Sequence, residues 1–201
     1  ILQFDRGLRA VAGEVSARRV NPAIDIPEAE LDTGERRHAA ALMRINHCGE
    51  VCAQALYQGQ SLASGNEHIK QTLEAAAVEE EDHLAWTRQR IEELGGHTSL
   101  LNPVWYVGSL AIGYAAGKLG DAWNLGFLAE TETQVGKHLE GHLSRVSIKD
   151  ARTRTLIAAM RSEEEGHART ARELGARELP PPFKAAMRLA ARAMTSTAYW
   201  V

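Results

Sequence analysis

The feature that most constrains this chain is a Glu-x-x-His motif that occurs twice, each time inside a stretch of helix-forming residues. The first copy runs from Glu80 to His83 and the second from Glu164 to His167. Residues three positions apart on a helix lie on one face, with their Cβ atoms about 5–6 Å apart. Each motif can therefore offer a carboxylate and an imidazole to the same ion.

Each motif is preceded, at nearly the same distance, by another glutamate that lies on or beside an apolar helical stripe. Glu50 comes before the first motif and Glu132 before the second. The stripe around Glu132 repeats every three or four residues, the period of a core-facing helix: Leu125, Leu128, Val135 and Leu139. Four buried carboxylates without a cation would have raised pKa values and a large desolvation cost. We therefore expect a cation among them.

The predicted metal ligands are six side chains: Glu50, Glu80, His83, Glu132, Glu164 and His167. Two Glu-x-x-His helices, with one glutamate from each of two further helices, are the ligand pattern of di-iron and di-manganese sites in ferritin-like bundles. In that geometry Glu80 and Glu164 bridge two metals, Glu50 and Glu132 are terminal ligands, and each histidine binds one metal. Oxygen and nitrogen ligands without a thiolate favour iron or manganese over a structural zinc. We predict two iron ions per chain, cycling between Fe²⁺ and Fe³⁺.

The same patterns predict an all-α fold, a ferritin-like four-helix bundle built from two helical hairpins. The four bundle helices are expected at residues 34–63, 67–94, 121–146 and 149–174, and an extra C-terminal helix at 183–195. Asp32 or Thr33 can cap the first helix. The expected organisation is an N-terminal arm (1–32), the bundle with its long apolar crossover (33–175, crossover 98–120), and a proline-rich break with the last helix (176–201).

The crossover contains an uncharged run, residues 98–117, that matches the minimum length of a membrane-spanning helix. Its glycines, Asn102 and Pro103 make it a poor span, so two interpretations stay open: a buried long connection, or a helix at the membrane interface. Trp105, Tyr106 and Trp123 suit either a bilayer interface or a protein core. The periodic stretch 5–19 likewise predicts an exposed amphipathic arm or a basic arm that faces a membrane.

Several chemically capable side chains are expected to lie outside the ligand set. Glu79, Glu81 and Glu130 fall off the seams and are predicted to be flanking or solvated charges. Cys48 and Cys52 have no second cysteine pair, so packing is favoured over a zinc or redox role, and a reducing compartment fits. Packing is also favoured for His47, His138 and His142, with an outer contact to the metal site or substrate as the alternative. The formal net charge of −3 gives no reason to expect nucleic acid.

Four segments resemble the bacterial demethoxyubiquinone hydroxylases, also called 3-demethoxyubiquinol 3-hydroxylases: residues 46–53 (NHCGEVCA), 79–84 (EEEDHL), 100–106 (LLNPVWY) and 130–132 (ETE). The resemblance covers nearly the whole chain and includes all six ligand positions. It implies an O₂-dependent di-iron monooxygenase, with the di-iron centre itself as the catalytic group, that hydroxylates the ring of polyprenylated demethoxyubiquinol in ubiquinone biosynthesis. The implied partners are the polyprenylated quinol, O₂, an external electron donor, the membrane surface and accessory proteins of ubiquinone biosynthesis. The implied location is peripheral, on the cytoplasmic face of the bacterial inner membrane.

Two other functions use the same ligands. A ferritin-like iron-storage protein or ferroxidase would need a soluble cage, and the apolar crossover argues against it. Another di-iron oxygenase could act on tRNA, which the lack of a basic face disfavours, or on acyl chains, which the sequence leaves open. No Gly-x-Gly-x-x-Gly motif is present, so electrons must come from outside the chain or from the quinol itself.

Overall fold

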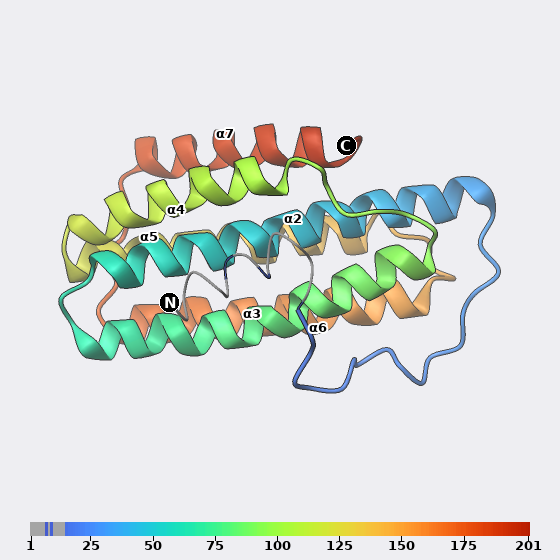
Figure 1. Ribbon diagram of the computed structural model, residues 1–201, viewed down its shortest axis with the longest axis horizontal. Coiled ribbons are helices and arrows are strands. Elements are labelled where there is room, and N and C mark those ends of the chain that lie inside the picture. Colours follow the sequence, from blue (N-terminus) through green and yellow to red (C-terminus); the bar gives the residue numbers. More distant parts are fainter. Residues whose placement is uncertain (1–6, 8, 10–14) are drawn as a thin grey trace.

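The computed structural model describes Gly7, Arg9 and residues 15–201, and all regular structure within residues 15–201 is helical (Figure 1). Six helices follow one another there: α2 (Thr33–Ala63), α3 (Glu67–Glu93), α4 (Asn102–Lys118), α5 (Asp121–Leu143), α6 (Ala151–Glu173) and α7 (Pro181–Ala198). The long helices α2, α3, α5 and α6 pack side by side, while α4 and α7 lie along one side of them. The predicted all-α class is confirmed, and the arrangement is consistent with a ferritin-like bundle.

Side-chain caps define where the first two bundle helices begin. The Asp32 carboxylate accepts the Glu35 backbone N–H at 2.8 Å, and the Glu35 carboxylate accepts the Asp32 N–H at 3.0 Å. This reciprocal pair is a capping box, and it makes Asp32 rather than Thr33 the cap of α2. Asn66 caps α3 in a similar way by accepting the His68 and Ile69 N–H groups.

Three helices differ from the sequence prediction by two or more residues at one or both ends. The third bundle helix stops at Leu143 instead of residue 146, because the Arg154 guanidinium binds the carbonyl oxygens of Leu143 and Val146. The fourth begins at Ala151 instead of residue 149, because Asp150 accepts the Thr153 N–H and acts as its cap. The last helix is longer than predicted, since a proline at the first helical position is tolerated there.

Two apolar clusters fill the bundle and leave a polar layer between them. The first cluster contains Leu42, Met43, Trp86, Ile91, Leu156, Ile157 and Met160. The second contains Tyr57, Ile69, Leu73, Leu125, Leu128 and Ala171. Since all four bundle helices contribute to both clusters, the positions between them along each helix form one cross-section through the bundle. That cross-section holds the predicted ligands.

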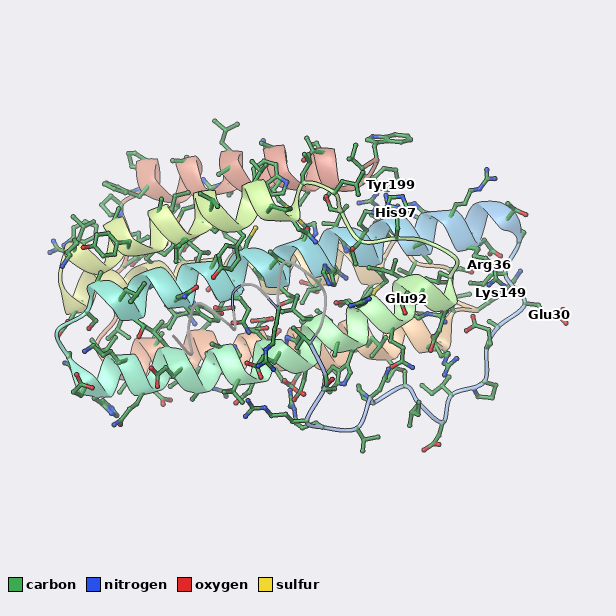
Figure 2. The ribbon with its side chains drawn as sticks, viewed as in Figure 1. Glu30, Arg36, Glu92, His97, Lys149 and Tyr199 are labelled. Carbon is green, nitrogen blue, oxygen red and sulfur yellow. The ribbon has the colours of Figure 1, made fainter. Side chains whose placement is uncertain are left out.

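Arg44 ties the two outer helices to the bundle. Its Nε donates to the His97 carbonyl at 2.7 Å, and its Nη1 donates to the Tyr199 carbonyl at 3.1 Å. Figure 2 shows His97 and Tyr199 close together beside α2. One buried guanidinium thus binds both the connection before α4 and the residue that follows α7.

The uncharged stretch predicted as part of the crossover forms α4, which packs directly against α2. Gly59 and Gly113 make the contact, because a Cβ at either position would strike backbone atoms of the opposite helix. The other side of α4 is open: Val104, Val107, Ile112 and Tyr114 are exposed. Across the described residues we find no helix with the length and apolar character needed to cross a bilayer.

Each of the three aromatic residues that suited either a bilayer interface or a protein core makes a contact within the protein. Trp105 packs against the cluster of Ile45, Cys48 and Ala198, while Tyr106 donates a hydrogen bond to Gln58. Trp123 lies 5.8 Å from Phe183, measured between ring centroids.

The described part of the N-terminal arm, residues 15–32, runs along the outside of the bundle to the start of α2 (Figure 1). The periodic stretch 5–19 lies largely outside the described residues, and its described end, 15–19, is not helical. Glu28 in this segment pairs with the buried Arg90 guanidinium, with its two oxygens 2.5 and 2.9 Å from Nη1 and Nη2. Residues 15–32 are therefore attached to the bundle by buried charge.

The backbone contact between α2 and α4 makes a testable prediction. Gly113→Ala should lower the free energy of unfolding by about 1–3 kcal/mol, because the added methyl group forces the two helices apart. Gly108→Ala is the matched control, since a Cβ there meets nothing within 4 Å. That variant should be neutral or more stable by up to about 1 kcal/mol, because alanine is the better helix former. Urea unfolding followed by circular dichroism measures both, and equal effects would contradict the close packing.

Candidate metal centre

The polar layer brings together all six side chains that the sequence singled out. Glu50 comes from α2, Glu80 and His83 from α3, Glu132 from α5, and Glu164 and His167 from α6. The four carboxylates are at most 2% exposed, and His83 is fully buried. His167 is the most open of the six, with 12% of its side chain exposed.

The six residues form two overlapping groups of four. Within each group, one ligand atom per residue lies within 4.8 Å of all the others. The first group is Glu50, Glu80, His83 and Glu164, and the second is Glu80, Glu132, Glu164 and His167. Glu80 and Glu164 belong to both groups, which is the arrangement of two residues that bridge a pair of ions.

The inner nitrogen of each histidine faces the shared carboxylates. His83 Nδ1 lies 2.7 Å from Glu80 and 3.6 Å from Glu164, while His167 Nδ1 lies 3.4 and 3.5 Å from the same two residues. The buried atoms His167 Nδ1 and Glu164 Oε2 have no hydrogen-bond partner in the described structure. Buried polar atoms without a partner are costly, so this donor set fits a pair of divalent cations.

The charges of the layer are balanced by protons when no cation is bound. Burial, together with the neighbouring carboxylates, raises the pKa of Glu50 and Glu132 well above its usual range. Burial opposes the charge on His167, but Glu164 and Glu80 outweigh it and raise its pKa to about 12. His83 likewise has a raised pKa, because Glu80 outweighs the burial of the ring. These shifts favour the neutral acid forms of Glu50 and Glu132 and the charged imidazolium forms of His83 and His167. Divalent cations must displace these protons to bind.

Tyr57 is a member of the site that the sequence analysis missed. Its buried hydroxyl donates a hydrogen bond to Glu132 and lies 3.4 Å from Glu80 Oε1. The signal was present, because Tyr57 lies two helical turns after Glu50 and so on the same face of α2. The same position is also typical of an ordinary aromatic residue in the apolar stripe of α2, so the sequence alone did not distinguish Tyr57 as part of the site.

Beside Tyr57 lies a cavity of about 20 Å³ whose lining includes Gln54, Leu73, Ala77 and, from α4, Tyr106. This space is large enough for one water molecule and too small for an aromatic ring.

The acidic neighbours of the ligands are less solvated than predicted. Glu130 does not point into solvent: its side chain is 13% exposed and lies 3.2 Å from Lys184 Nζ, so that prediction is wrong. The α7 helix, whose first turn supplies Lys184, covers it. Glu81 is equally shielded and pairs with Arg18 at 3.0 Å. Glu79 does flank the centre, with 46% of its side chain exposed, yet it also binds His167.

Three further histidines named in the sequence analysis lie outside the ligand groups. His47, His138 and His142 belong to neither group of ligands. The His142 Nδ1–H donates to Asn46 Oδ1 at 2.8 Å, and its ring lies 4.0 Å from that of His138. Burial lowers the pKa of His47 and His138 to about 4, and that of His142 to about 2. All three are therefore neutral at pH 7.

The fold and the layer define a class: an all-helical bundle with a buried cluster of carboxylates and histidines that could hold metal ions. Comparison with known proteins narrows this class. A family model described as "Ubiquinone biosynthesis protein COQ7" matches residues 37–198. This chain belongs to that family, as the resemblance of its four segments predicted.

Full-length relatives are named "3-demethoxyubiquinol 3-hydroxylase". The protein from Azoarcus sp. (strain BH72) is 56% identical over 201 residues, which are 100% of this chain and 98% of the relative. That from Chromobacterium violaceum is also 56% identical, with the same coverage. The one from Nitrosospira multiformis is 55% identical and covers 100% of this chain and 97% of the relative.

The Tyr57 hydrogen bond yields a second prediction. Tyr57→Phe removes one hydroxyl and should weaken binding of the cation held by Glu132 by about 10–100-fold, the usual effect of losing an outer hydrogen-bond partner. Anaerobic Fe²⁺ titration of the purified protein measures this. Tyr114→Phe, at an exposed position of α4, is the control and should bind Fe²⁺ as the parent does. Unchanged affinity in Tyr57→Phe would show that the hydroxyl does not hold Glu132 in place.

The buried histidines make the metal-free protein sensitive to acid. A histidine has a pKa of about 6.5 in the unfolded chain, whereas that of folded His142 is about 2. The stability that neutral His142 contributes to the folded protein is therefore fully present above pH 6.5. As the pH falls below that value, the unfolded chain binds a proton at this residue, and the free energy of unfolding drops by about 2 kcal/mol by pH 5. In His142→Gln the drop in unfolding free energy between pH 7.5 and pH 5 should be smaller by that amount. His68→Gln, at an exposed position, should leave the drop unchanged. Urea unfolding with a chelator present makes the comparison.

Proposed function

We propose that this chain is an O₂-dependent di-iron hydroxylase that adds a hydroxyl group to the ring of polyprenylated demethoxyubiquinol. The observation that carries the proposal is the pair of overlapping ligand groups in a dry layer, with Glu80 and Glu164 common to both. The full-length relatives named 3-demethoxyubiquinol 3-hydroxylase support the substrate. Bound iron would supply the oxidising power by reducing O₂ with electrons from an external donor or from the quinol.

The chain's own residues would hold and isolate the centre. Glu50 and Glu132 would each bind one iron, Glu80 and Glu164 would bind both, and His83 and His167 would complete one site each. The apolar clusters above and below the layer keep bulk water away from the ligands. Tyr57 would hold Glu132 in its binding orientation.

The outer surface fits a substrate with a long apolar tail. Val104 and Val107 on α4 are 64% and 66% exposed, and Leu189 on α7 is 69% exposed. Trp105 from α4 and Met194 from α7 pack against the same cluster, so the two helices flank one side of the bundle. We propose that this side lies on the cytoplasmic face of the bacterial inner membrane, as a peripheral contact. Tyr106 would then stand between the membrane and the cavity beside Tyr57.

The reaction can be tested with ¹⁸O₂. Anaerobically loaded protein, given a short-chain demethoxyubiquinol, a reductant and ¹⁸O₂, should release a quinol with one ¹⁸O in its new hydroxyl group, as measured by mass spectrometry. Glu164→Ala removes a ligand of both ions, so activity should fall by more than the roughly 100-fold upper range for outer partners. A protein that takes up and oxidises Fe²⁺ but transfers no oxygen to the quinol would favour the ferroxidase alternative.

The membrane contact has its own test. Val104→Asp combined with Val107→Asp should weaken flotation with vesicles of bacterial phospholipid by roughly 10-fold or more for each residue, since burying a valine is worth at least about 1.5 kcal/mol. Ile148→Asp changes an even more exposed apolar residue, in the α5–α6 connection, and should float as the parent does. Equal flotation of both variants would exclude α4 as the contact.

A further inference from the structure

The outer nitrogen of each predicted histidine ligand is bound by a carboxylate from the opposite helix. His83 on α3 meets Glu163 of α6, with 3.0 Å between Nε2 and Oε2. His167 on α6 meets Glu79 of α3, with 3.1 Å between the same atom types. In both cases the carboxylate is the residue directly before the shared glutamate, so the repeated unit is Glu-Glu-x-x-His.

These two contacts between α3 and α6 decide which nitrogen of each histidine ring is free to bind a cation. A neutral imidazole carries one N–H and one lone pair. A carboxylate only accepts, so the proton belongs on Nε2 and the lone pair on Nδ1. Nδ1 is the nitrogen that faces Glu80 and Glu164 in both motifs. Carboxylate, histidine and cation then form a chain in which the carboxylate orients the ring and strengthens its basicity.

The two outer carboxylates are held in different ways. Glu163 forms a two-pronged pair with Arg19, at 2.9 Å to Nη1 and 2.8 Å to Nη2. Its side chain is 25% exposed, against 46% for Glu79, which has no arginine partner among the described residues. The fork geometry of arginine fixes the plane of Glu163, whereas within residues 15–201 Glu79 is oriented by His167 alone.

Arg19 is itself fixed to α3 by Asp82, a buried residue next to His83. The Asp82 carboxylate accepts the backbone N–H groups of Arg18 and Arg19 at 2.5 and 3.2 Å, and its other oxygen lies 2.5 Å from Arg19 Nε. The N-terminal segment is therefore seated directly over the His83 side of the layer. On the His167 side the described chain has no equivalent.

We infer that Glu163 and Glu79 are positioning residues, each for the metal-binding histidine of the opposite helix, and that Arg19 makes cation affinity at the His83 group depend on the docking of residues 15–32. The inference rests on the proposed metal centre but goes beyond it. It assigns an outer contact to each group and makes the two groups unequal. It also gives the N-terminal segment a part in metal binding.

The test measures each group separately. Glu132→Gln removes a ligand found only in the His167 group and leaves the His83 group intact, while Glu50→Gln does the reverse. These two single variants serve as the parents for further changes. Each is titrated anaerobically with Co²⁺, whose visible absorption reports both affinity and ligand geometry. Both parents should bind one Co²⁺ per chain.

Second changes are then compared between the two parents. Glu163→Gln keeps the shape of the side chain but removes its charge, and should weaken Co²⁺ binding about 10–100-fold in the Glu132→Gln parent only. Glu79→Gln should do so in the Glu50→Gln parent only. Arg19→Gln should follow the pattern of Glu163→Gln. Arg18→Gln is the matched control, because its side chain pairs with Glu81 rather than with Glu163.

The outcomes distinguish a failure of the positioning roles from a failure of the metal centre itself. Losses confined to the matching parent, with a changed Co²⁺ spectrum and unchanged circular dichroism, support the inference. Equal losses in both parents, or none, overturn it while leaving the metal centre in place. Failure of both parents to bind any Co²⁺ would overturn the metal centre itself. If Glu163→Gln does not fold, the half-exposed Arg19 carries the test, and an Arg19→Gln variant with unchanged affinity in both parents would exclude the dependence on the segment.

Discussion

The structure depends on keeping four carboxylates ionisable in a place where water cannot reach them. Charge burial without compensation is among the largest penalties a small protein can carry. Here the compensation comes from two imidazoles in the same cross-section, and from protons that Glu50 and Glu132 retain when no cation is present. Two apolar clusters, one on each side along the bundle axis, isolate the layer. The bundle thus gathers carboxylates and imidazoles that could hold divalent ions into one buried layer.

Much of the fold and of the buried layer could be predicted from the sequence, because helical periodicity is strict. The burial of Glu80 and Glu164 in the layer could be predicted ahead of their acidic neighbours, since only one residue in each acidic run falls on the apolar seam. The fold class followed from the same stripes and from the matching distances in the two halves. The chemistry of carboxylate and imidazole donors then limited the choice of metal.

What escaped prediction depends on contacts between segments distant in the chain. The stop of α5 at Leu143 needs Arg154 from the next helix, and the shielding of Glu130 needs Lys184 from α7. Tyr57 resembles any aromatic residue of a core until Glu132, 75 positions later, is placed opposite it. For the same reason the sequence predicted Glu79 only as a flanking or solvated charge and did not single out Glu163. Their partners lie on the other Glu-x-x-His helix, and no pattern within one helix identifies them.

The crossed carboxylates have a consequence for how such a chain could have arisen. A single hairpin that carries Glu-Glu-x-x-His cannot complete its own histidine, because the outer carboxylate comes from a second copy of the motif. Two identical hairpins related by a two-fold axis would satisfy each other at once, since a self-complementary contact made by one is made by both. Such a homodimer would have two equivalent metal positions. Once both copies were joined in one chain, a single residue outside the repeat could make the positions unequal, as Arg19 does here.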